Sequence, residues 1–125
     1  IILRTTQSLV VVVMWQVRLA GLLGGSSVAC GAAGAHALND RDPNFLAIWK
    51  TAVQYQQFHA LALLATPLAA SVRAKLVAGI CFSSGTLLFC GSNYLVAFYQ
   101  DRSYGKMSPY GGMLLIGGWL ALALL

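Results

Sequence analysis

The sequence predicts an all-α protein: an integral membrane four-helix bundle with an N-terminal helical extension. Of its 125 residues, 58% are hydrophobic and only 9% are charged, whereas an ordinary soluble domain carries about 25% charged residues. A soluble fold this short could not bury so much apolar surface. The charged residues also concentrate between four apolar stretches. We therefore expect these stretches to be helices surrounded by hydrocarbon.

The first stretch that we expect to cross the bilayer is Val17 to Leu38, which is rich in small residues. Gly21 and Gly25 are four residues apart, and small residues at this spacing let helices approach closely in lipid. Joined to residues 1–16 as one helix, this stretch would be about 57 Å long, against a hydrocarbon core of about 30 Å. We therefore expect residues 1–16 to form a separate interfacial helix or an extension, and residues 17–125 to form the four-span membrane domain.

The second predicted helix runs from Pro43 to about Ala70. Asp42 directly precedes Pro43, and a carboxylate cap followed by proline at the first helical position is typical of a helix start. The first half of this helix is mixed in polarity and the second half is almost purely apolar. Pro67 removes one backbone hydrogen bond, so a kink or a helix end is expected there.

The third predicted helix, Leu76 to Tyr99, contains no charged residue and no histidine. Its length of about 36 Å is enough for one crossing. Small and mildly polar residues recur along one face from Gly79 to Ala97, which predicts close helix packing. The fourth predicted span is Gly111 to Leu125, where Gly111 and Gly118 share a face.

The charges and cysteines exclude two classes of protein. The net charge is +5, but the lysines and arginines are scattered singly near helix ends. Such cations anchor helices at lipid headgroups, so membrane lipids are the expected partners and nucleic acid is not. The three cysteines lie inside apolar stretches without metal-site spacing, so neither a disulfide framework nor a metal site is expected.

Arg4 and Arg18, with no acidic residue before Asp40, are typical of the downstream end of a transit peptide.

Two ionisable side chains, His36 and His59, are expected at membrane depth, which makes them candidates for function. His59 lies one helical turn from Tyr55 and Gln56. Together with His36, these three residues form the candidate binding set. The simplest interpretation is that each imidazole bonds a neighbouring helix or a backbone carbonyl. Ligation of a haem iron, or contact with a proton or a quinone, stays open. The sequence has no nucleophile constellation and no paired carboxylates, so we expect no catalytic residue, no resident cofactor and no enzyme activity.

Four segments of the sequence resemble a known family: GAAGAHAL (31–38), WKTAVQYQQFHALALL (49–64), AGICFSSGTLLFCGSNYL (78–95) and SPYGGMLLIGGWLALAL (108–124). In order and spacing they are similar to the transmembrane protein 256 / domain of unknown function 423 family, small multi-pass proteins of bacteria and mitochondria. The resemblance covers about residues 17–125 and implies a four-helix membrane fold without an established reaction. His36 and His59 match histidines typical of the family. Ala33 stands where the family often has an aromatic residue, and residues 1–16 lie outside the common pattern.

The predicted function is that of a non-catalytic accessory, or supernumerary, membrane subunit of a larger assembly. The expected host is a respiratory-chain complex of the mitochondrial inner membrane. Small-residue faces on the first, third and fourth spans exceed what one four-helix bundle needs to close itself, so we expect other membrane subunits as partners. One alternative is a small transporter, or a lipid- or quinone-binding protein, that uses the His36/His59 region. Others are a haem-binding anchor and, for localisation, the bacterial plasma membrane.

Overall fold

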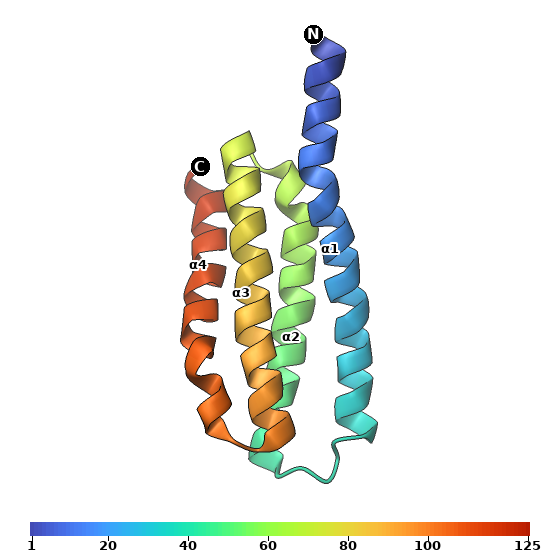
Figure 1. Cartoon of the computed structure of the whole chain (residues 1–125), viewed down its shortest axis with the longest axis vertical. Coiled ribbons are helices and arrows are strands. Elements are labelled where there is room, and N and C mark those ends of the chain that lie inside the picture. The colour runs from blue at the N-terminus through green and yellow to red at the C-terminus, as the bar shows by residue number, and fades with distance from the viewer.

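The computed structural model describes residues 1–125, apart from the side chain of Val12. Four long helices alternate in direction, and short 3-10 helices occupy two of the connections (Figure 1). In chain order the elements are α1 (Ile2–His36), α2 (Pro43–Ala65), η1 (Thr66–Leu68), α3 (Val72–Tyr99), η2 (Arg102–Met107) and α4 (Ser108–Leu124). The expected all-α fold is confirmed.

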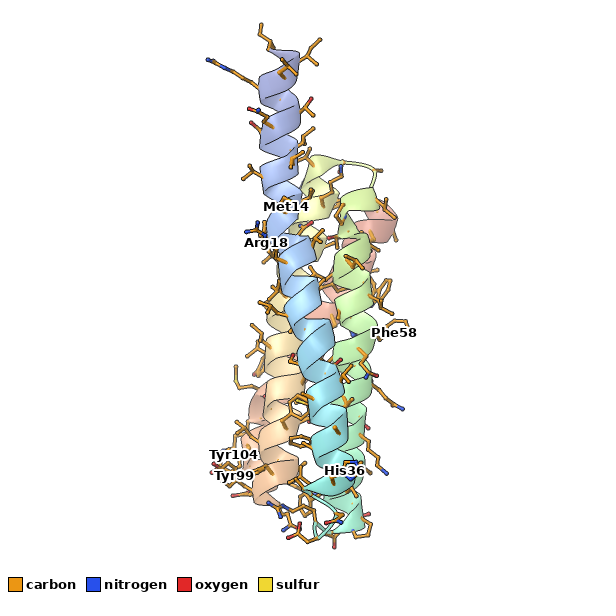
Figure 2. All side chains as sticks on the ribbon, turned by 90° about the vertical axis from the view of Figure 1, so that its right-hand side faces the viewer. Met14, Arg18, His36, Phe58, Tyr99 and Tyr104 are labelled. Carbon is orange, nitrogen blue, oxygen red and sulfur yellow. The ribbon has the colours of Figure 1, made fainter. Side chains whose placement is uncertain are left out.

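The helices pack in the order of the chain: α1 on α2, α2 on α3, and α3 on α4. Figure 1 shows α1 and α4 at opposite sides of the molecule, and Figure 2, turned by 90°, shows α1 in front with α2 and α3 behind it. α2 has 23 residues and is therefore about 34 Å long, enough to cross a hydrocarbon core of about 30 Å.

Three helical segments are long and apolar enough to cross a membrane, namely Ile2–His36, Val72–Tyr99 and Arg102–Leu124. α2 is less apolar, because its first half carries lysine and glutamine side chains. It nevertheless lies between α1 and α3, which run in the same direction. A chain that crosses the membrane along α1 and again along α3 in the same sense must return between them, so α2 is the expected return span and the set of four spans stays a prediction.

α1 is one continuous helix of 35 residues, about 52 Å long. The segment before Val17 thus continues the helix of the first predicted span, and the start of α1 projects beyond the other helices (Figure 1). α1 begins to pack on the bundle at Trp15 and Gln16. Gly79 of α3 makes room for them, because a Cβ there would lie 3.2 Å from the Trp15 ring and 3.0 Å from Gln16 Cδ.

Local sequence signals set the ends of α2. The Asp42 carboxylate accepts a hydrogen bond of 2.9 Å from the backbone N–H of Asn44, and Pro43 is the first helical residue, so the predicted helix start is confirmed. The α-helix ends at Ala65, short of the expected Ala70, and passes into η1 around Pro67. The proline ring cannot donate to the preceding turn, which explains the end at this point.

The connection between α1 and α2 is tied to the far end of α3. Arg41 Nε donates to the carbonyl of Phe98 at 3.1 Å, and the backbone N–H of Asp42 donates to Gln100 Oε1 at 3.0 Å. Gln100 adopts the left-handed conformation, with φ of 53°. Asp101 then accepts a hydrogen bond from the backbone N–H of Ser103 at 2.9 Å, which lowers the pKa of Asp101.

Glycines bring α3 and α4 close together. A Cβ on Gly85 would lie 3.0 Å from the carbonyl oxygen of Gly111, and a Cβ on Gly118 would lie 2.6 Å from the Phe82 ring. The small-residue stripe of α3 also faces the interior: Gly79, Ser83, Thr86, Cys90 and Ala97 are all buried. The small-residue faces of the third and fourth helices are therefore filled by the protein's own side chains.

Candidate functional site

An apolar groove lies between α2 and α4, with Phe89 of α3 at its floor. Its volume is about 640 Å³, within the range typical of small-ligand sites. Aromatic side chains make much of its wall, and the nitrogen-bearing side chains are those of Gln54, His59 and Trp119. The lining residues are Gln54, Tyr55, Phe58, His59, Phe89, Pro109, Gly112, Met113, Leu115, Ile116 and Trp119. We refer to it as the α2–α4 groove.

His59 is the buried imidazole of this groove, 5% exposed, and both of its ring nitrogens have protein partners. Nδ1 lies 2.8 Å from the carbonyl oxygen of Tyr55, and Nε2 lies 3.1 Å from Nε1 of Trp119. A carbonyl oxygen can only accept and an indole N–H can only donate. The geometry therefore assigns the neutral tautomer, with the proton on Nδ1 and the lone pair of Nε2 accepting from Trp119.

Aromatic rings enclose the imidazole on several sides. The ring centroids of Tyr55, Phe82 and Trp119 lie 5.8, 5.8 and 5.9 Å from that of His59. Phe58 makes an edge contact at 5.6 Å. Tyr55 also packs on Phe89 at 4.6 Å. This apolar cage holds the imidazole in one orientation, so the bridge from His59 to Trp119 links α2 to α4 across the groove.

Gln56 is adjacent to Tyr55 in sequence but points about 100° away from it around α2, where it joins three helices. Its Nε2 donates to the carbonyl of Leu23 at 2.9 Å and to Ser26 Oγ at 2.8 Å, both on α1. Its Oε1 accepts from the hydroxyl of Tyr94 on α3 at 2.6 Å. Because the amide nitrogen and the amide oxygen of Gln56 both bond inside the protein, this side chain holds α1, α2 and α3 together. It does not line the groove.

His36 lies at the end of α1, exposed, near the foot of the molecule in Figure 2. His59 is sixteen residues into α2 from its start at Pro43, about 24 Å up that helix. The structure thus separates the four candidate residues. Tyr55 and His59 share the α2–α4 groove, Gln56 belongs to the interior network, and His36 stands apart at a helix end.

Sequence reasoning missed three residues whose side-chain hydrogen bonds tie the helices together: Gln16, Tyr94 and Trp119. Gln16 is fully buried, donates from Nε2 to the carbonyl of Lys75 at 2.8 Å, and accepts from the Thr66 hydroxyl at 2.9 Å. It ties the upper part of α1 to η1 and to the start of α3. A usable signal was available, since an amide in an apolar helix needs a hydrogen-bond partner.

The side chains that line the groove are mostly apolar. Its lining in the described part of the chain holds no carboxylate, no thiol and no aliphatic hydroxyl. The imidazole that could move a proton is occupied at both nitrogens. No cluster of three or more histidine, cysteine or acidic side chains that could hold a metal ion occurs among the described residues.

Comparison with known proteins gives the family of this chain. Residues 30–112 match the family described as "Protein of unknown function (DUF423)". A UPF0382 membrane protein of Staphylococcus epidermidis is 39% identical over 78% of this chain and 83% of its own length. The UPF0382 membrane protein YwdK of Bacillus subtilis is 34% identical over 77% and 82%, and a UPF0382 membrane protein of Schizosaccharomyces pombe is 34% identical over 87% and 97%. No solved structure matches the chain. The chain is a membrane protein that belongs to the DUF423 family, as its sequence motifs indicated.

Proposed function

We propose that this membrane protein is a non-catalytic subunit of a larger membrane assembly and that it contacts its neighbour through α1. The observation that carries the proposal is the open space over three glycines of α1. A Cβ built on Gly21, Gly24 or Gly25 meets no heavy atom of the described residues within 4 Å. The glycines of α3 and α4 that bring those two helices together are, in contrast, already covered within the chain.

Two of these glycines, Gly21 and Gly24, line a second groove, which lies between α1 and α2. Its volume is about 460 Å³, and its lining residues are Val17, Ala20, Gly21, Gly24, Ser27, Val28, Gln57, Ala60, Leu61 and Leu64. Small side chains from both helices form much of this surface, which lets the backbone of a third helix approach closely. In lipid such close packing is the main source of association between helices. We call this surface the α1–α2 face.

The proposed host is a respiratory-chain complex, and the proposed membrane is the mitochondrial inner membrane. Support comes from Arg4 and Arg18 in a region without acidic residues before Asp40, and from the projecting start of α1, which offers further contact area. Bacterial relatives make the bacterial plasma membrane the alternative. A transporter built on both histidines receives less support, because His36 lies outside the groove and His59 is bonded at both nitrogens.

The test is native electrophoresis of membranes solubilised in a mild detergent. The unaltered protein should comigrate with a large complex. Gly21→Leu should release it, because the leucine side chain occupies the α1–α2 face, and its Cβ meets no described atom of the protein within 4 Å. Gly91→Leu on α3 is the matched control, since a Cβ at Gly91 also meets no described atom within 4 Å, and it should leave comigration intact.

Two outcomes contradict the proposal. The first is an unaltered protein that runs only as a free monomer or a small homo-oligomer. The second is comigration of Gly21→Leu with the complex to the same extent as Gly91→Leu. Mass spectrometry of the comigrating band identifies the host, and proteins other than respiratory subunits there would refute that part of the proposal. Cell fractionation tests the proposed membrane separately.

A further inference from the structure

We infer that the α2–α4 groove binds one acyl chain of an anionic phospholipid. The groove and the α1–α2 face lie on different faces of α2, so this inference does not depend on the proposed subunit contact. Phe58 and Leu61 illustrate the division, since the first lines the groove and the second lines the α1–α2 face.

The shape of the groove favours a thin flexible chain over a helix. An α-helix with its side chains is about 10–12 Å across and needs small residues to dock closely. The walls of the α2–α4 groove instead carry the bulky side chains of Tyr55, Phe58, Ile116 and Trp119. These side chains keep the backbone of a neighbouring helix at a distance, but the groove of about 640 Å³ between them has room for a hydrocarbon tail.

The position of the groove specifies a ligand from the bilayer. It follows α4 from Pro109, the second residue of that helix, to Trp119, and the segment Arg102–Leu124 is apolar enough to span a membrane. One end of the groove therefore lies at the loop side of the protein, and the other lies ten residues or about 15 Å deeper. Met113 and Ile116 on its wall are 59% and 60% exposed, so an occupant can enter sideways from the lipid.

Charge at the loop end specifies the headgroup. Lys106 is exposed in η2, three residues before Pro109. A cation at the membrane surface attracts anionic lipid headgroups. A phospholipid whose acyl chain enters from this end places its phosphate at the level of Lys106 and the terminal carbons of that acyl chain near His59 and Trp119. At the deep end of the groove, the polar groups of His59 and Trp119 are hydrogen-bonded to each other. This end of the groove is therefore suited to hydrocarbon.

The experiment uses Trp119 as the reporter. The full chain is reconstituted in phosphatidylcholine vesicles that contain a small fraction of phosphatidylglycerol brominated on its acyl chains, because bromine quenches tryptophan fluorescence on contact. The expected result is saturable quenching at a low fraction of brominated lipid. This quenching should disappear in Trp119→Phe, which identifies the reporting side chain.

A matched pair of glycine variants tests whether the lipid lies in the groove. A Cβ on Gly112 would lie 3.8 Å from the Phe89 ring, and a Cβ on Gly117 would lie 3.8 Å from Cys81 Sγ, so both positions have the same room for a Cβ. Of the two, Gly112 lines the groove. Gly112→Leu should therefore abolish saturable quenching and Gly117→Leu should retain it. Equal quenching in the two variants, or quenching that merely follows the mole fraction of brominated lipid, overturns the inference.

The headgroup is tested by replacing the brominated phosphatidylglycerol with brominated phosphatidylcholine. The anionic lipid should bind about fivefold more tightly, as expected for one lysine near the surface, and Lys106→Gln should remove the preference. Equal binding of the two lipids overturns the assignment of an anionic headgroup. Relief of quenching by a quinone, but not by unlabelled phosphatidylglycerol, overturns it in favour of a prenyl tail.

Discussion

Replacing Gln56 by leucine should separate the buried hydrogen-bond network from simple hydrophobic packing. Gln56 is 5% exposed and makes three hydrogen bonds, two to α1 through Leu23 and Ser26 and one to α3 through Tyr94. Leucine is similar in size and well suited to a helix in lipid. A loss of stability in Gln56→Leu would therefore report the lost bonds.

The expected magnitude follows from these contacts. Side-chain hydrogen bonds inside membrane proteins average about 0.6 kcal/mol each, so the three bonds together contribute about 2 kcal/mol. The Tyr94 hydroxyl is left without its acceptor, which adds about 1 kcal/mol. We expect Gln56→Leu to lower the free energy of unfolding by about 2–3 kcal/mol, which reduces the ratio of folded to unfolded protein by roughly thirtyfold or more.

The assay is unfolding in mixed micelles, with dodecyl sulfate added to protein in dodecyl maltoside and tryptophan fluorescence as the signal. Gln57→Leu is the matched control, because Gln57 is exposed, and its free energy of unfolding should change by less than about 0.5 kcal/mol. A double-mutant cycle of Gln56→Leu with Tyr94→Phe should give a coupling energy of about 0.6–1.7 kcal/mol. Equal losses at Gln56 and Gln57, or a coupling of zero, would refute the reasoning.

Three further outcomes are expected in the same unfolding assay and by NMR. Gly111→Ala should lower the free energy of unfolding by about 1–3 kcal/mol, because the new Cβ would lie 2.9 Å from the Cα atom of Phe89 on α3. Gly112→Ala should be tolerated, because its Cβ would lie 3.8 Å from the Phe89 ring. Equal unfolding midpoints for the two variants would contradict this. Thr86→Val should leave stability unchanged or raise it by about 1 kcal/mol, because its buried hydroxyl has no partner among the described residues; a marked loss would reveal a partner. Trp119→Phe should lower the free energy of unfolding by about 1 kcal/mol. It should also shift the ¹⁵N resonance of His59 Nε2 while the proton stays on Nδ1. A proton on Nε2 in the unaltered protein would exclude the assigned tautomer.

Much of the fold was predictable because its signals are local. Charge depletion identifies the environment, and the pairs Asp42–Pro43 and Thr66–Pro67 mark the start and the end of α2 through capping and the missing proline donor. The continuity of α1 was harder to predict. No proline or strong cap separates Gln16 from Val17, so an uninterrupted helix and two separate helices were both compatible with the sequence.

The site was predictable in part. The rule that ionisable groups at membrane depth are candidates identified His59, but its partner Trp119 is 60 residues away and no local pattern links them. Tyr55 and Gln56 were chosen together because both lie one helical turn from His59. Adjacent helical side chains point about 100° apart, and packing by α1, α3 and α4 decides that one lines a groove while the other enters the interior.

The central claim, that the chain crosses the bilayer four times with α2 as the return span, is tested most directly by labelling single cysteines from each side of sealed membranes. Asp40→Cys, Ala70→Cys and Ser103→Cys, all at exposed positions, would be made after the native cysteines are replaced by alanine (Cys30, Cys81 and Cys90). An impermeant maleimide should label positions 40 and 103 from one side and position 70 from the other. Labelling of positions 40 and 70 from the same side would show that α2 does not cross and would contradict the account.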